Sequence, residues 1–234
     1  MNNVDTMKRI YLSTQQTLEE HDHRFEYKYQ HLRHSNSECY VFLRLRSSKW
    51  CTQSTKEYYA EFGVGSRSIA EYFGSNPQSS FSMVSMRVLS HDGSSLQKPW
   101  IVSTESDAIE TGTRIAIELI KRWPTQIKPL LSERGMCDWL HEKNAPRLVE
   151  RAVLHMKFGD IDQVKSLYHQ MLTELDTQSK HRAEALKKIA RLPGGESRVK
   201  ELESREDPTW IDWMAVQVEY VRAYLLENDF DISQ

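Results

Sequence analysis

Hydrophobic residues in the first 30 positions change from helical spacing to strand spacing. Three- and four-residue steps predict an amphipathic helix over residues 4–20. Its apolar face consists of Met7, Ile10, Tyr11, Thr14 and Leu18. From Arg24 the period becomes two, because Phe25, Tyr27 and Tyr29 alternate with charged or amide residues. The pattern therefore predicts a helix followed by a half-buried strand.

Four further segments have the composition of strands. The polar turn at residues 34–37 leads into residues 39–46, where apolar residues alternate with arginines. So short a connection predicts an antiparallel hairpin with the strand before it. The remaining predicted strands cover residues 57–64, 81–89 and a short piece at 100–103. In the segment 81–89, Phe81, Met83 and Ser85 alternate with Val84, Met86 and Val88, which places the two sets on opposite faces.

Helical periodicity replaces strand periodicity after Thr104. Thr104 or Ser106 is a suitable cap for a helix that continues to Trp123, where Pro124 ends it. Further helices are predicted at residues 125–132, 135–143, 146–157, 160–175, 179–192 and 208–227. Strands followed by helices indicate an α+β fold, with an N-terminal helix, a four- to five-stranded antiparallel sheet and an all-helical C-terminal half. We expect a first domain over residues 1–123 and a helical region over 124–234.

Composition is that of an ordinary globular protein. The chain has 234 residues, 39% hydrophobic and 27% charged, enough to build a core without covalent staples. Cys39, Cys51 and Cys137 are scattered and odd in number, which favours a reducing compartment over a disulfide scaffold. No stretch has the length and apolar character of a signal peptide or a membrane span, so a cytoplasmic location is expected.

No motif for catalysis or metal binding is specific. Gly63-Val-Gly65 lacks the third glycine of a dinucleotide loop and the Gly-Lys-Ser/Thr of a P-loop, and therefore predicts the end of a strand. His21 and His23 are two residues apart at a helix end, whereas helical zinc ligands usually sit four apart. We expect no catalytic residues, no metal and no cofactor. A hydrolase is the third-ranked function.

Basic and aromatic residues share the outer face of the first predicted hairpin. This set consists of Lys28, Tyr40, Phe42, Arg44, Arg46 and, just beyond the strand, Lys49. Exposed, it would suit nucleic acid or an acidic partner, because aromatics stack on bases and arginines pair with phosphates. Covered by the second-half helices, it would place Tyr40 and Phe42 in the core and the arginines at its rim. The sequence favours the covered arrangement, and we expect no nucleic-acid binding.

The end of the chain combines acidic residues with tryptophans. The formal net charge is −2 overall, but residues 203–234 hold eight acidic and two basic residues. Tryptophan is a frequent anchor of protein interfaces, and acidic charge selects a basic partner. The predicted partner-binding residues are Glu206, Asp207, Trp210, Asp212, Trp213 and Glu219. The alternative is that both tryptophans close the helical core.

Several segments resemble an uncharacterised bacterial α+β domain family, the domain-of-unknown-function 4304 type. The matching pieces are residues 46–50 (RSSKW), 61–65 (EFGVG), 98–102 (KPWIV), the helix at 106–123, and 158–172. Leu45-Arg46 stands where that family usually has a hydrophobic residue followed by glutamine, and residues 176–234 lie outside the resemblance. Some members look like immunity-type proteins that accompany toxins. The resemblance therefore favours a non-enzymatic interaction protein, such as an inhibitor of a basic toxin; the alternative is a nucleic-acid-binding module.

Overall fold

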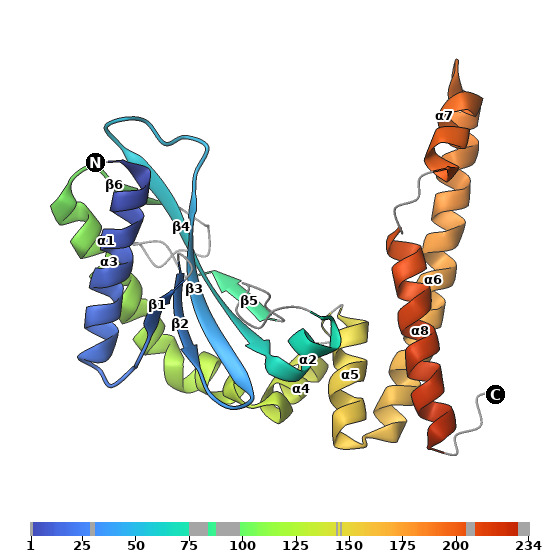
Figure 1. Cartoon of the computed structure of the whole chain (residues 1–234), viewed down its shortest axis with the longest axis horizontal. Coiled ribbons are helices and arrows are strands. Elements are labelled where there is room, and N and C mark those ends of the chain that lie inside the picture. Colours follow the sequence, from blue (N-terminus) through green and yellow to red (C-terminus); the bar gives the residue numbers. More distant parts are fainter. Residues whose placement is uncertain are drawn as a thin grey trace. The chain divides into compact units, whose positions relative to one another are not determined.

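The computed structural model describes two compact units, Met1–Trp139 and Leu140–Gln234 (Figure 1). Within them, the structure describes residues 2–28, 31–74, 84–87 (backbone only), 99–143, 145, 147–204 and 209–228. The α+β class is confirmed: an N-terminal helix and an antiparallel sheet precede a helical C-terminal half. No helix in these ranges is long and apolar enough to cross a membrane.

The sheet of the first unit contains six described strands. They are β1 (Glu26–Lys28), β2 (His31–Ser35), β3 (Cys39–Ser47), β4 (Lys56–Ser66), β5 (Val84–Arg87) and β6 (Trp100–Val102). The spatial order is β1-β2-β3-β4-β5, and β6 pairs with the other end of β4. All pairings are antiparallel. The long β3–β4 ladder, from Cys39↔Ser66 to Ser47↔Tyr58, forms the centre of the sheet.

Helices α1 (Asn3–Glu19) and α3 (Glu105–Arg122) pack side by side on one face of this sheet (Figure 1). The buried phenol of Tyr11 fixes α1 to β3, where its hydroxyl accepts a 2.7 Å hydrogen bond from the Leu45 amide. The two helices approach closely at Gly112, where an added Cβ would lie 2.5 Å from the Ile10 carbonyl oxygen. The Thr14 hydroxyl donates to the Gly112 carbonyl at 3.1 Å across this contact.

Short elements close the first unit. Helix α2 (Arg67–Tyr72) follows β4, and a π-helical turn (Trp123–Ile127) and a 3-10 turn (Lys128–Leu131) lead into α4 (Glu133–Glu142). The buried Glu133 carboxylate accepts hydrogen bonds from the Ser66 hydroxyl and the Ser68 amide, so it joins the start of α4 to the start of α2.

The second unit contains helices α5 (Leu148–Phe158), α6 (Ile161–Ala190), α7 (Gly195–Glu203) and α8 (Trp210–Glu227). Gly159 ends α5 in the left-handed region, with φ 69°. Helix α6 packs against the other three, and its buried side chains include Val164, Leu167 and Met171 (Figure 1).

Three elements differ from the sequence prediction. Residues 31–35 form strand β2, whereas the pattern suggested a single strand before the turn at 34–37. The helices predicted at 160–175 and 179–192 are one continuous helix, because the polar residues between them bond along the helix: Gln178 to Glu174 and Lys180 to Asp176. The helix predicted at 125–132 is a π turn and a 3-10 turn, since Pro124 and Pro129 each lack an amide donor.

The other predicted elements agree closely with the structure, where the structure describes them. Gly63 and Gly65 lie near the end of β4, as expected for a strand terminus. Helices α2 and α7 have no counterpart in the sequence prediction. Of the strand predicted at 81–89, residues 84–87 are β5; its flanking residues and the facing of its side chains lie outside the described residues.

Candidate interaction surfaces

The start of α8 is fixed by a capping box. The Thr209 hydroxyl accepts from the Asp212 amide at 3.3 Å, and the Asp212 carboxylate accepts from the Thr209 amide at 2.8 Å. These hydrogen bonds from Thr209 hold the pKa of Asp212 below its ordinary value. Arg182 of α6 donates to the Thr209 hydroxyl at 3.2 Å, which joins the cap to the neighbouring helix. The sequence Thr-Trp-Ile-Asp therefore sets where α8 begins.

One side of α8 is buried. Met214, Gln217, Val218, Val221 and Leu225 are shielded from solvent, and α8 packs against α6. Tyr224 donates from its hydroxyl to the Met156 carbonyl of α5 at 3.0 Å, which fixes the rotation of α8 near its C-terminal end. At about 100° per residue, the four aliphatic buried residues fall within a sector of roughly 60°. The helix thus uses a narrow face for its own core.

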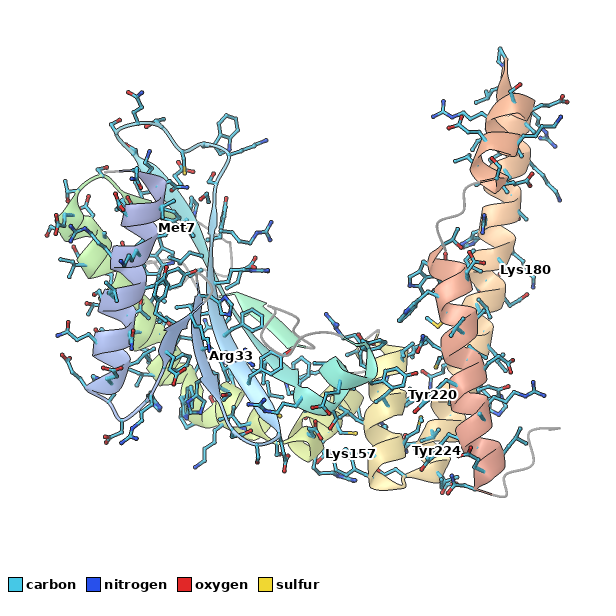
Figure 2. All side chains as sticks on the ribbon, viewed as in Figure 1. Met7, Arg33, Lys157, Lys180, Tyr220 and Tyr224 are labelled. Atoms are coloured by element: carbon cyan, nitrogen blue, oxygen red, sulfur yellow. The ribbon has the colours of Figure 1, made fainter. Side chains whose placement is uncertain are left out.

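A second apolar face of α8 is exposed. Trp210, Trp213, Val216 and Tyr220, which we name the α8 stripe, have relative exposures between 36% and 65%. They fall within a sector of roughly 120° beside the buried face. Figure 2 shows Tyr220 and Tyr224 projecting from the same side of the helix. Leu226, 55% exposed, lies on the opposite flank. The tryptophans therefore do not close the helical core.

Five of the thirteen exposed large apolar side chains in the described parts of the chain are on α8. Sequence reasoning identified Trp210 and Trp213 but missed Val216 and Tyr220. The signal was the three-residue step from Trp213 to Val216 and the four-residue step from Val216 to Tyr220, but it was hidden because apolar residues occur all round this helix.

Acidic residues border the α8 stripe. Asp212 and Glu219 lie between the stripe and Leu226, and Glu227 follows the stripe towards the end of the helix. Glu219 accepts from Arg222 at 3.2 Å, while Asp212 is engaged in the cap. Glu206 and Asp207, also predicted as partner-binding, lie outside the described residues. The described part of α8 therefore combines an aromatic centre with an acidic border.

The other candidate surface is the sheet face opposite α1. The register places Arg33 of β2, Phe42 of β3 and Gly63 of β4 side by side, with Tyr40, Arg44 and Arg46 on the same parity of β3. Arg44 and Arg46 donate to opposite oxygens of the buried Glu61 carboxylate, at 2.8 and 3.1 Å. Burial alone would raise the pKa of Glu61, but the two guanidiniums outweigh it and hold that pKa below its ordinary value. The arginines are thus partly neutralised within the sheet.

Tyr40 and Phe42 are buried, as the covered arrangement predicts. The Tyr40 ring lies across Gly65, where an added Cβ would be 2.4 Å from the ring, and the Arg33 guanidinium lies 4.8 Å from the ring centroid. Burial raises the pKa of Tyr40 to about 12. Lys28 and Arg46 are exposed. The helix α3 packs with α1 on the opposite face, so neither of these helices buries Tyr40 and Phe42.

The β3–β4 hairpin ends in an exposed tryptophan. Trp50 is 67% exposed, and the Lys49 ammonium lies 4.9 Å from its ring centroid. Lys49 was predicted from sequence as part of the basic set, whereas Trp50 was missed as a functional candidate. Its position in a Ser- and Thr-rich turn, where an indole has little to pack against, was the available signal.

Histidines gather at the end of α1 without forming a metal cluster. His23 lies against Trp123 with ring centroids 4.3 Å apart, and His34 lies 5.3 Å from the same ring. Asp22 between the first two histidines adopts φ 62°, a left-handed conformation that aspartate tolerates. Across the described ranges, no group of three or more His, Cys, Asp or Glu residues is arranged to hold a metal ion.

Comparison of the chain with protein-family models, with curated proteins and with solved structures found no match. Function is therefore inferred from the geometry of this chain.

Proposed function

We propose that this chain is a non-enzymatic interaction protein that binds a partner protein through the α8 stripe. The observation that carries the proposal is the second apolar face of α8, which remains exposed although the helix already buries one side against α6. A helix that is apolar on most of its circumference is normally buried on most of it. A partner protein that covers the α8 stripe would bury this second apolar face.

The composition of the stripe supports a protein partner. Tryptophan and tyrosine are enriched among the residues that dominate binding energy, and interface centres are typically apolar with a polar border. On α8 the aromatics occupy the centre, and Glu219 and Glu227 stand at the border. The local excess of acidic residues over 203–234 gives the partner a complementary, basic character.

A basic toxin is the partner class that we favour, with this chain as its immunity-type inhibitor. The support is the acidic end of the chain, whose charge would complement a basic partner. Binding through a rigid helix would require no catalytic group in this chain. A cytoplasmic location agrees with the odd number and scattered positions of the three cysteines, Cys39, Cys51 and Cys137.

Site-specific cross-linking tests the proposal even while the partner is unidentified. Photoreactive benzoylphenylalanine is placed at Tyr220 in the stripe or, as the matched control, at Leu226 on the opposite flank. Both positions are exposed to a similar extent, 48% and 55%, so both side chains can react. We expect a discrete adduct with one protein from position 220 and none from 226. Identical adducts from both positions, or none from either in cells that produce the chain naturally, would reject the α8 stripe as the binding surface.

A further inference from the structure

The tip of the β3–β4 hairpin is a structured turn that holds an indole out in solvent. The Ser48 amide donates to the Glu57 carbonyl at 2.8 Å, and the Ser48 hydroxyl accepts from the Trp50 amide at 3.2 Å. Cys51 Sγ accepts from the Glu57 amide at 3.3 Å, and Thr52 closes the turn through the Thr55 amide at 3.0 Å. These hydrogen bonds fix the backbone on both sides of Trp50.

Positive charge leads from the sheet to this tip. Arg44 and Arg46 are alternate residues of β3, so they project from one face about 7 Å apart. One carboxylate, Glu61, accepts hydrogen bonds from both guanidiniums. Lys49 adds its ammonium beside the indole. The arrangement has more donors for an anion than acceptors of its own.

We propose that Trp50, Lys49, Arg46 and Arg44 form a binding surface for a single-stranded nucleic acid. A base would stack on the indole, and phosphates would take the free donors of the two arginines and the lysine. Tyr40 and Phe42 were candidates for stacking only in the alternative, exposed arrangement of this face, and both are buried, as the favoured arrangement predicts. Trp50 is the exposed aromatic at the end of the basic row, so it replaces them in this role.

A membrane surface or an acidic peptide fits these residues less well. Trp50 is the one large apolar residue of the turn; its neighbours from Thr52 to Thr55 are hydroxyl and amide residues, which gain nothing in a bilayer. An acidic peptide would satisfy the cations but has no repeating flat group for the indole. A nucleic-acid strand presents a π face and a phosphate at every residue. This surface is in the first unit and does not depend on the α8 stripe.

Fluorescence anisotropy of the full chain with labelled dT20 and U20 tests the proposal. Binding should appear at about 50 mM salt and weaken steeply towards 200 mM, because bound phosphates release counterions. Trp50→Leu should weaken binding roughly tenfold, whereas Trp50→Phe should retain most of it, since phenylalanine keeps a π face for stacking. Trp210→Ala, which alters an exposed tryptophan of α8, is the matched control and should change nothing.

The salt dependence tests the cations separately. Arg46→Ala with Lys49→Ala should reduce the slope of log affinity against log salt by about 1.4, the loss of two phosphate contacts to a single strand. The exposed pair Lys187→Ala and Lys188→Ala on α6 should leave the slope unchanged. The proposal is overturned if neither oligonucleotide binds at about 50 mM salt, or if Trp50→Leu binds as tightly as the unaltered chain. Trp50-dependent binding of polyglutamate or of anionic vesicles in place of the oligonucleotides would also overturn it.

Discussion

The Tyr224 hydroxyl of α8 donates a 3.0 Å hydrogen bond to the Met156 carbonyl in the last turn of α5. This contact and the hydrogen bond from Arg182 of α6 to the Thr209 hydroxyl hold α8 near its two ends. Between them, the helix has one rotation, in which Val218 and Val221 are buried and Trp213 and Tyr220 are exposed. The exposure of the α8 stripe is thus a consequence of specific hydrogen bonds at both ends of the helix.

Removing the Tyr224 hydroxyl tests this restraint. Tyr224→Phe keeps the ring but loses the hydrogen bond, so the free energy of unfolding should fall by about 1 kcal/mol. Urea unfolding of the full chain, followed by circular dichroism, measures the loss. Val216→Ala on the same helix is the control: the Val216 side chain is 65% exposed, so its truncation should change the free energy of unfolding by less than about 0.5 kcal/mol. Equal stability of both variants would show that the α5 contact does not restrain α8.

The close approach of α1 and α3 at Gly112 predicts that alanine at this position lowers the stability of the protein. Replacing a glycine within a helix by alanine usually raises the stability of the protein by up to about 1 kcal/mol. At Gly112 the new methyl group would lie 2.5 Å from the Ile10 carbonyl oxygen and would force the helices apart. We therefore expect Gly112→Ala to lower the free energy of unfolding by roughly 1–3 kcal/mol, measured by denaturant titration. A gain in stability would contradict the observed packing of α1 on α3.

Glu61 predicts a loss of stability at acid pH. Its folded-state pKa lies below the ordinary value because the attraction of Arg44 and Arg46 exceeds the cost of burial. The stabilisation is therefore complete above the unfolded pKa and is lost as the pH falls through the folded one. Glu61→Gln should destabilise the protein by roughly 1–2 kcal/mol at neutral pH, a value reduced by the solvent exposure of the arginines. The difference from the unaltered chain should shrink below about pH 4. A difference that stays constant with pH would exclude the ionic origin.

His23 predicts a second, higher pH window. Burial first, and then the nearby His34 and His21, lower the pKa of its imidazole, while Asp22 opposes them. The folded state thus binds protons less readily than the unfolded chain, and stability should decline as the pH falls from about 6.5 towards the folded pKa. His23→Gln should remove this part of the decline. Fluorescence of Trp123, whose ring lies against His23, should report the same titration. An unchanged pH profile in the variant would show that His23 is not the source of the decline.

The periodicity of apolar residues predicted most helices and strands, because each of these elements buries one face and its apolar residues recur at that face. Periodicity failed where backbone pairing or side-chain hydrogen bonds, and not apolar burial, determine the element. Strand β2 is followed by so polar a turn that His34 and Ser35 read as part of that turn, although both pair with β3. Helix α6 continues through residues 174–180 on side-chain bonds along the helix, which apolar periodicity does not detect.

The candidate surfaces were harder to predict, because exposure depends on which face tertiary contacts bury. From the sequence, Trp213 and Val218 are equally suitable core residues. In the structure, the rotation of α8 buries Val218 and leaves Trp213 exposed. Tyr40 and Phe42 are buried, as the sequence favours, although α1 and α3 cover the opposite face of the sheet. Trp50 is exposed in a turn of small polar residues, a signal that the sequence contains but that periodicity does not detect.

The central claim is that the α8 stripe supplies the binding energy for a protein partner. The partner identified by cross-linking is purified, and its dissociation constant is measured with two variants of this chain. The variants are Trp213→Ala and the control Leu226→Ala. If Trp213 is a central anchor, its replacement should weaken binding by about 30-fold or more, a change of at least 2 kcal/mol, while Leu226→Ala should change it less than about threefold. Equal dissociation constants for the two variants, with both chains folded, would contradict the account.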